Sequence, residues 1–336
     1  MLRSLLPASL TSLLLVAAAW PEDTYDLVPR FADGMQLDYP LTGKFNAELD
    51  DVTAEMGGQD ILGGAVAGDI QVEIEGNVQE EILETKDGAV VKMRRSFLGL
   101  EWSAQGEAEA AGESQSLDES GENDLVGRVL EITIDEDGEA TVVDVTEGDL
   151  EALDAEELEA QGKVNTFESL LPSEPVEVGG TWNPVGMLET ISEDMLKEAE
   201  AEGDAEVFQQ FMDALHEYGS AEATGTLVSV EDDVAEISWE INLSLDIGDL
   251  LSFAQLFDES GDLEDIPPGA MATMYMGLAI EGSGKFDLVH HQLTSLELSG
   301  DFEFEAGGEM DSDQISISAN ASASGELSLT TGATIL

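Results

Sequence analysis

Residues 35–49, MQLDYPLTGKFNAEL, alternate apolar and polar side chains along much of their length. Successive side chains of a β-strand point to opposite faces, so a period of two predicts a strand with one buried and one solvated face. Ile70, Val72, Ile74 and Val78 resume the alternation with acidic residues between them. The sequence therefore predicts a sheet of long, half-buried strands.

Turn signals divide these patterns into hairpins. Asp87-Gly88 and the run from Asp135 to Gly138 carry the Asp and Gly residues that adopt positive φ in tight turns. Three long strands are predicted near the end of the chain, at about 270–289, 292–305 and 314–330. Residues 105–124 are small and polar, and they predict a long exposed loop.

Two segments carry apolar residues at helical spacing instead. The first runs from about Glu193 to Tyr218 and the second from Leu250 to Phe257. A curved antiparallel sheet with one apolar face needs a cover, and these amphipathic helices could supply it. We expect a mainly β protein with covering helices (an α+β fold), in which a long antiparallel curved sheet or half-barrel is built from two similar halves.

Four segments follow from the composition along the chain. Residues 1–19 combine Arg3, a short apolar core and the small run Ala17 to Ala19, which predicts a secretory signal peptide, with an uncleaved anchor as the alternative. Residues 166–187 hold three prolines, a glycine pair and Trp182, and are interpreted as a hinge. The hinge separates an N-terminal β half, 20–165, from a C-terminal half of helix plus strands, 188–336.

The formal net charge is −63, from 74 acidic and 11 basic residues. Nucleic acid is a poor partner, because phosphate binding needs clustered Lys and Arg and the one tight basic cluster is Lys92, Arg94 and Arg95. The chain has no cysteine, which excludes disulfides and cysteine metal sites. No later stretch has 18 uninterrupted apolar residues, so no transmembrane segment is expected in the mature chain. We expect an exported bacterial protein of the periplasm or the extracellular space.

Recognisable catalytic motifs are missing from the sequence. His216-Glu217 lacks the second histidine of an H-E-x-x-H zinc site, and there is no G-x-S-x-G nucleophile elbow. His290 and His291 are expected to be exposed turn residues. Pairs of carboxylates carry little information among 74 acidic residues. The protein is not expected to be an enzyme, and a carboxylate-dependent hydrolase is the third hypothesis.

Calcium is the one candidate cofactor. Three segments are rich in oxygen ligands: Asp118 to Glu122, Asp135 to Glu139 and Asp258 to Asp262. None has the ligand spacing of an EF-hand, and solvated turns are the alternative interpretation. These segments favour a second hypothesis, a structural, envelope-associated acidic protein with a filled core and a calcium-binding surface.

The leading hypothesis is a non-enzymatic binding protein that holds an apolar ligand or a lipidated partner between the sheet and the helices. Methionine adapts to irregular hydrophobic ligands, and Met and Phe recur on the predicted helices and on the strand near residue 275. A filled core is the alternative, because helical stripes usually pack. The sequence favours no particular oligomeric state. The residues expected to line the ligand are Phe208, Phe211, Met212, Leu215, Phe253, Phe257, Met274 and Met276.

In architecture this layout resembles the periplasmic lipoprotein-carrier and mycobacterial lipid-binding half-barrels, which are exported chains of long meandering strands with helices over one sheet face. The segment Leu171 to Trp182, LPSEPVEVGGTW, is also similar to a segment of secreted bacterial proteins of uncharacterised function. The first resemblance implies an apolar ligand under the helices. Neither implies catalytic residues.

Overall fold

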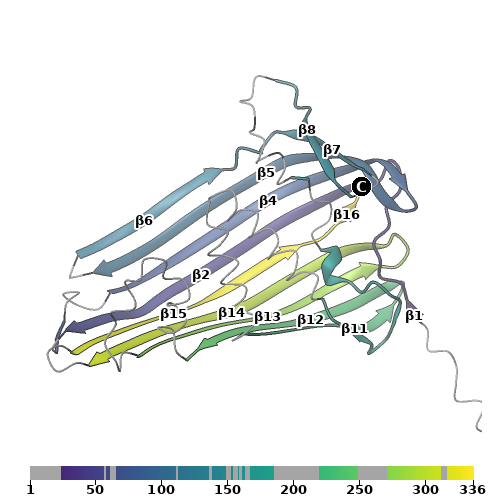
Figure 1. Ribbon diagram of the computed structural model, residues 1–336. Helices are drawn as coiled ribbons and strands as arrows, with labels where there is room; N and C mark the ends of the chain where they lie inside the picture. The colour runs from purple at the N-terminus through teal and green to yellow at the C-terminus, as the bar shows by residue number, and fades with distance from the viewer. Residues whose placement is uncertain are drawn as a thin grey trace, which may run out of the picture.

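The computed structural model describes residues 24–56, 58–60, 66–110, 113–135, 138–148, 153, 158, 161–162, 167–184, 219–248, 271–311 and 316–336. Its elements are almost all β-strands (Figure 1). In chain order they are β1 (Thr24–Tyr25), β2 (Gln36–Met56), β3 (Gln59–Asp60), β4 (Val66–Lys86), β5 (Ala89–Ala110), β6 (Glu113–Glu122), β7 (Val129–Ile134), β8 (Ala140–Asp144), the 3-10 turn η1 (Glu168–Leu170), β9 (Val176–Glu177), β10 (Thr181–Trp182), β11 (Gly219–Glu231), β12 (Val234–Ile247), β13 (Met271–Asp287), β14 (Gln292–Asp311), β15 (Ser316–Thr331) and β16 (Thr334–Ile335).

One large antiparallel sheet contains nearly all of these strands. Its order is β10-β11-β12-β13-β14-β15-β2-β4-β5-β7-β8, and β6 extends the far part of β5 (Figure 1). Most neighbours are joined by hairpins, with Asp87 and Gly88 at positive φ between β4 and β5. The β15–β2 pair joins the last long strand of the chain to the first. The N-terminal and C-terminal strands therefore meet along one seam in the middle of the sheet.

Alternation gives this sheet two chemically opposite faces. One row across β12, β13, β15, β2 and β4 consists of Ile241, Ile280, Leu327, Phe45 and Val72, with Gly300 of β14 between the second and third. We call the side that carries this row the inner face. The next row, one residue along each strand, faces the other way and reads Glu240, Glu281, Ser299, Ser328, Lys44 and Glu73. We call that side the outer face.

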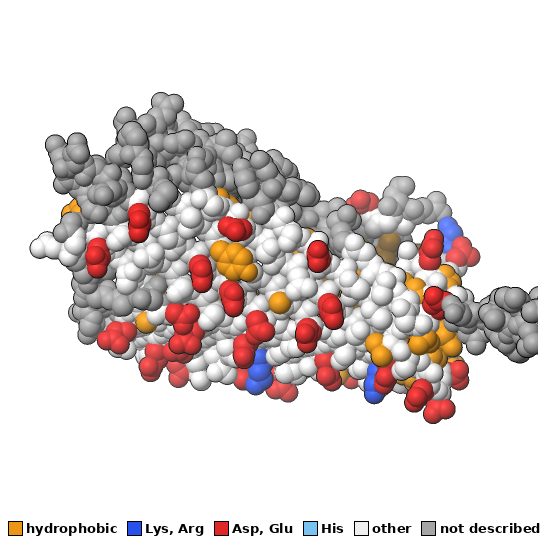
Figure 2. Space-filling model, turned by 90° about the horizontal axis from the view of Figure 1, so that it is seen from below, with side chains coloured by type: hydrophobic (Ala, Val, Ile, Leu, Met, Phe, Trp, Pro, Cys, Tyr) orange, Lys and Arg blue, Asp and Glu red, His pale blue; other side chains and the backbone are white. Residues whose placement is uncertain are grey.

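On the outer face, carboxylates stand directly opposite one another across neighbouring strands. Glu75, Glu101 and Glu122 form one such ladder over β4, β5 and β6. A second ladder, Glu48, Asp69 and Glu107, crosses β2, β4 and β5. Figure 2 shows carboxylates spread over the surface seen from below, with few basic side chains among them. Like charges directly opposite each other in a sheet repel, so the carboxylates of the outer face destabilise the folded state.

Two clusters of buried residues lie at one end of the sheet, on the inner face. Leu245 and Ile247, at the other end of β12, are also buried. The first cluster centres on Trp239 and Phe286, and the second on Leu37 and Met93. Segments outside the large sheet cover both clusters. Leu27, Leu170 of η1 and Leu171 pack into the first cluster, and Phe31 packs into the second. Burying these side chains is the main stabilising contribution at this end.

Two tryptophans hold the segment around η1 against the sheet. The indole nitrogens of Trp182 and Trp239 each donate a hydrogen bond of 2.8 Å to the carbonyl oxygen of Leu170. The ring of Trp182 lies on Gly225 of β11, where a Cβ would come within 2.3 Å of the indole. A buried carbonyl with two donors satisfies both indoles, and the glycine makes the close approach possible.

The segment between β1 and β2 closes the same end. The amide of Arg30 donates to the carbonyl of His291 in the β13–β14 turn, and the amide of Phe31 donates to the carbonyl of Gly88 in the β4–β5 turn. These two turns are separated in the sheet by β15 and β2, three strand spacings or about 14 Å if the sheet were flat. Adjacent residues bond to both turns, so the sheet curls around its inner face here.

The expectation of covering helices is wrong, and with it the α+β class. Among the described residues, η1 is the only helical element with defined bounds, and no helix in that part of the chain is long and apolar enough to cross a membrane. Residues 193–218 and 250–257, on which the expectation rested, lie outside the described residues. The inner face is covered at its packed end by extended chain instead, because Leu27, Phe31 and Leu171 bury apolar surface without helical periodicity.

The expectation of an exposed loop at residues 105–124 is also wrong. Here β5 continues to Ala110 and β6 runs back beside it, in register from Ala110 and Glu113 to Glu101 and Glu122. The small and charged residues belong to an edge strand, where such residues discourage pairing with other chains. An edge strand and an exposed loop have similar amino-acid compositions, so composition alone could not distinguish them here.

The carboxylate ladders predict that neutralising a central member stabilises the fold. Glu101→Gln should raise the melting temperature by up to about 3 °C at low salt, since it relieves repulsion from Glu75 and Glu122. The gain should largely vanish in 1 M NaCl, where the screening length falls to about 3 Å.

Glu297→Gln is the matched control, because Glu297 stands opposite Ser283 and Thr330. Calorimetric scans at both salt concentrations measure the effect. Equal shifts for the two variants would show that the ladder geometry carries no specific repulsion.

The tryptophan contacts predict a steric test at Gly225. Gly225→Ala should destabilise the protein by about 1–3 kcal/mol, because the new methyl displaces the Trp182 ring and its hydrogen bond to Leu170. Gly99→Ala, at a β5 site with no atom within 4 Å of the added Cβ, should be nearly neutral. Urea unfolding of both variants measures the difference, and equal stabilities would contradict the packing described here.

Candidate functional site

The candidate site is the part of the inner face that lies beyond the two core clusters. Phe45, Ile74, Trp102, Leu117 and Met276 are 36–39% exposed there, although their strand register turns them to the same side as the core. Phe45 and Ile74, for example, stand an even number of residues from the buried Leu37 and Ile82 of their own strands. We define the open patch as these five residues together with Phe302.

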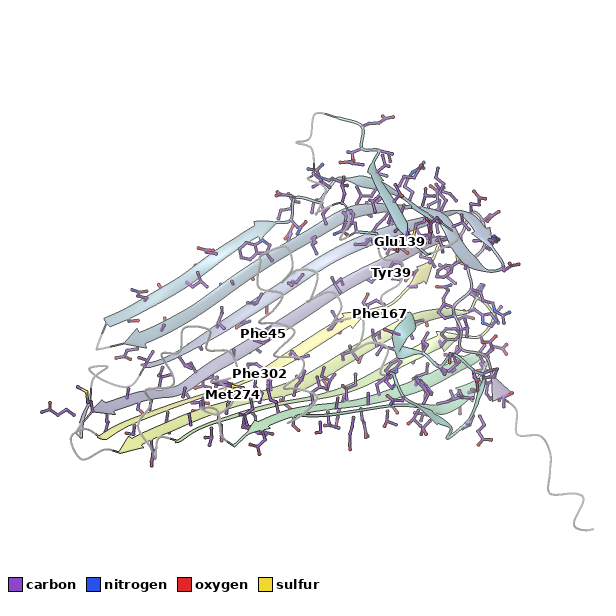
Figure 3. The ribbon with its side chains drawn as sticks, viewed as in Figure 1. Tyr39, Phe45, Glu139, Phe167, Met274 and Phe302 are labelled. Atoms are coloured by element: carbon purple, nitrogen blue, oxygen red, sulfur yellow. The ribbon has the colours of Figure 1, made fainter. Side chains whose placement is uncertain are left out.

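An aromatic pair forms the centre of the open patch. The rings of Phe45 (β2) and Phe302 (β14) stack with centroids 5.4 Å apart and planes 7° from parallel. Between their strands, Gly325 of β15 leaves room for the pair, since a Cβ there would lie 2.3 Å from the Phe302 ring. In Figure 3 the two residues lie in the long part of the sheet, away from Tyr39 and Phe167 at the packed end. The stacked rings thus form an apolar, partly exposed surface on the inner face, away from the packed end.

Of the residues expected to line a ligand, Met274 and Met276 are described. Both are on the inner face of β13, where Met274 pairs with Ile247 and Ala306, and Met276 pairs with Leu245 and Phe304. The structure thus places Met276 in the open patch and Met274 one row beyond it (Figure 3). The other expected residues lie outside the described residues: Phe208, Phe211, Met212, Leu215, Phe253 and Phe257. A lining role for these eight stays a prediction.

Sequence reasoning missed Phe45, Phe302 and Trp102 as site residues. The signal was present, because Phe45 is in phase with Leu37 and Leu49 in the alternating stretch that predicts β2. Phase within a strand shows only that these side chains share a face. The register between strands, which stacks Phe45 on Phe302, depends on the β15–β2 seam between the two ends of the chain.

An ion pair lies on the inner face beside the second core cluster. Nε and one terminal nitrogen of Arg95 donate to Oε1 of Glu80 at 2.9 and 2.7 Å, and the other terminal nitrogen donates to the carbonyl of Gln161 at 2.9 Å. The two side chains are only 12% and 6% exposed. Their hydrogen bonds offset the cost of burying both charges and tie Gln161 to the sheet.

The basic cluster Lys92, Arg94 and Arg95 is neutralised by neighbouring carboxylates. Lys92 and Arg94 both contact Glu131 on the opposite face from Arg95, and Arg94 also contacts Glu81. These contacts leave the cluster poorly suited to phosphate. The expectation that nucleic acid is a poor partner stays a prediction.

The oxygen-rich segments are not arranged as calcium sites where the structure describes them. Asp118 to Glu122 belong to β6, and the Asp135 carboxylate accepts the amide of Glu139 within its own turn at 2.9 Å. Asp258 to Asp262 lie outside the described residues. Across the described part of the chain, no three His, Asp or Glu side chains gather closely enough to hold a metal ion.

The two adjacent histidines differ from each other. His290 is exposed and its ring nitrogen lies 2.7 Å from the Asp287 carboxylate, as expected of a turn residue. His291 is half-buried at positive φ, with its ring edge-on to Phe286, so the expectation that it is exposed is wrong. Its carbonyl bonds to Arg30, which places the residue in the closure of the packed end. His216 lies outside the described residues.

Hollows on the outer face are polar and shallow. The one that includes Glu73 and Glu101 has a volume of about 540 Å³ and is floored by the strands that carry Ile74 and Trp102. The hydrogen bond from Lys44 is the main reason that the pKa of Glu73 is lowered. The pKa of Glu131 is lowered in the same way by Lys92. A glycosidase-type general acid needs a raised carboxyl pKa, so neither residue suits that role.

Comparisons with known proteins assign no family. No protein-family model matches the sequence, and no curated protein matches it. The chain is similar to an outer membrane channel from Pseudomonas putida F1, with 7% identity, 91% of this chain and 98% of that chain covered, and a TM-score of 0.21. It is similar to OccK7 of Pseudomonas aeruginosa, with 11% identity, 91% and 100% coverage, and a TM-score of 0.19. It is also similar to a FadL homologue of Pseudomonas aeruginosa, with 8% identity, 90% of each chain covered, and a TM-score of 0.20.

TM-scores at this level mean that the shapes do not superpose, so these likenesses carry no argument about fold or function. The resemblance to lipoprotein-carrier half-barrels is not confirmed.

The buried ion pair predicts strong coupling between Glu80 and Arg95. Arg95→Met should cost about 3–5 kcal/mol of unfolding free energy, because Glu80 is left charged and unpaired in a buried position. The double variant Glu80→Leu with Arg95→Met should recover most of that loss. Urea unfolding of the single and double variants measures the coupling, and simple additivity of the two changes would contradict it.

Proposed function

We propose that the protein is a non-enzymatic, extracytoplasmic binding protein that holds an apolar ligand on the inner face of its sheet. The observation that carries the proposal is the open patch. Its side chains are turned to the core side by strand register, yet five of them keep more than a third of their surface exposed. Contiguous apolar surface on a soluble protein commonly marks a binding site.

The arrangement of charge supports binding on the inner face rather than non-specific association over the whole surface. The outer face carries the carboxylate ladders, which keep the protein soluble and repel other copies of the chain. Apolar contacts are thereby confined to the inner face. The packed end is closed by the segment from Leu27 to Phe31, so a ligand would lie along the open part of the strands.

The occupant would be a small apolar molecule or the lipid group of a modified partner protein. Export is proposed from the signal-peptide pattern of residues 1–19, and a bacterial periplasm or extracellular location fits that pattern.

A second candidate is the structural, calcium-binding envelope protein. The observation that favours it is the directly opposed acids of the outer face, such as Glu101 and Glu122, which a divalent cation could bridge. Calcium should then raise the melting temperature more than NaCl of equal ionic strength.

The binding proposal predicts that polar substitutions in the aromatic pair weaken ligand binding. The full chain should bind the neutral apolar fluorophore N-phenyl-1-naphthylamine, and Phe45→Ser with Phe302→Ser should weaken its binding by about tenfold or more, because two aromatic contacts are lost. Fluorescence titration measures the dissociation constants.

Val228→Ser is the control, since Val228 is a 50% exposed apolar residue at the β11 irregularity and not part of the open patch. It should leave the affinity unchanged. If the Phe variant and the Val228 variant bind the fluorophore equally well, the open patch is not the binding surface.

A further inference from the structure

At the β6 edge of the open patch, an exposed tryptophan and a carboxylate share one face. Trp102 of β5 pairs with Gly121 of β6, and Ala104 pairs with Glu119. Trp102 and Glu119 are therefore diagonal neighbours on the inner face, with Cα atoms about 7–8 Å apart. Trp102 is 38% exposed and Glu119 is exposed. Both side chains are accessible from the side on which a ligand would lie.

The indole of Trp102 spreads towards the edge strand. A Cβ at Gly121 would lie only 3.0 Å from the Nε1 atom of Trp102. The indole ring therefore covers the backbone of β6 at Gly121, two residues from Glu119. The Glu119 carboxylate has no ion-pair partner among the described residues. An indole face beside an unpaired carboxylate is the combination that binds ammonium groups, by cation–π attraction and by charge.

Apolar side chains lead from this edge towards the middle of the sheet. The row that ends at Glu119 runs through Ala104 and Val72 to Phe45. Leu117 lies beside it on β6, opposite Gly106. From Phe45 to Glu119 is three strand spacings, about 14 Å. A hydrocarbon chain laid across the strands would thus begin at the charged edge and end at the aromatic pair.

Basic groups that could receive an anionic head group are committed elsewhere. Of the described lysines and arginines, Lys285 is on the outer face and Lys86 adjoins the β4–β5 turn at the packed end. The others form ion pairs with carboxylates, and they are Arg30, Lys44, Lys92, Arg94, Arg95 and Arg128. Together with the net charge of −63, this favours a cationic ligand over an anionic one.

We propose that the open patch binds a single cationic amphiphile, with its ammonium group at Trp102 and Glu119 and its hydrocarbon chain along the exposed apolar side chains of Ile74 and Phe45. This rests on the proposed function, because it names the ligand class of the same surface. Charge complementarity at the β6 edge sets the orientation of the ligand, and the apolar side chains supply most of the contact.

The test compares three ligands that share one hydrocarbon chain: dodecyltrimethylammonium, dodecanol and dodecyl sulfate. The two ionic ligands are kept below their micelle concentrations and dodecanol below its solubility limit. Calorimetric titration of the full chain at low salt should show the ammonium compound binding at least about tenfold tighter than the sulfate. Dodecanol should fall between them. Raising the salt to 0.5 M should reduce the difference in affinity between the ammonium compound and the sulfate, because salt screens the charges. Tetramethylammonium, which lacks the hydrocarbon chain, should not bind measurably.

Two variants locate the head group. Glu119→Gln should weaken ammonium binding by about threefold to fivefold and leave dodecanol unchanged. Asp118→Asn is the matched control, since it removes the same charge one residue away on the opposite face of β6 and should have a smaller effect. Trp102→Leu keeps an apolar side chain, so it should weaken the ammonium compound more than dodecanol.

The outcomes separate this inference from the function on which it rests. If none of the three ligands binds, the proposed apolar binding itself fails. If dodecanol binds but the sulfate binds as tightly as the ammonium, or if the Glu119 and Asp118 variants lose affinity equally, the cationic ligand class is overturned while apolar binding stands.

Discussion

The two-faced sheet depends on the alternation of apolar and polar residues along very long strands. This alternation turns residues such as Ile241, Leu327 and Phe45 to one side and Glu240, Ser328 and Lys44 to the other. The outer face opposes folding, because its carboxylates repel across the strands. Backbone pairing between the strands and burial on the inner face must overcome that repulsion, so the packed end bears most of the stabilisation.

The packed end shows how a sheet of this kind closes without described helices. Leu170 offers one carbonyl to the indoles of Trp182 and Trp239, and the chain near Arg30 joins two hairpin turns that the sheet order separates. Both contacts bring segments from outside the large sheet onto the inner face. They reach only the ends of the long strands, which leaves the side chains around Phe45 and Phe302 partly exposed. Stability and the proposed ligand binding thus depend on different parts of the same strands.

Strand patterns could be predicted from the sequence wherever alternation was regular. The three final strands and the Asp87-Gly88 turn were expected, and they are observed as β13, β14, β15 and the β4–β5 hairpin. The edge strand β6 could not be distinguished from a loop, because edge strands and loops share small, charged residues. The aromatic pair could not be found either, since its contact depends on pairing between strands from opposite ends of the chain, which periodicity within a strand does not encode. Met274 and Met276 were chosen for their chemistry, and strand phase places both on the inner face.

The central claim is that the inner face holds an apolar molecule. Native mass spectrometry of the full chain, purified from an exporting host without detergent, tests it most directly, followed by identification of any mass released on unfolding. The account predicts one apolar molecule bound per chain, and its loss from the variant that carries Phe45→Ser and Phe302→Ser. A stably folded protein with no bound mass, unaltered by those substitutions, would contradict it.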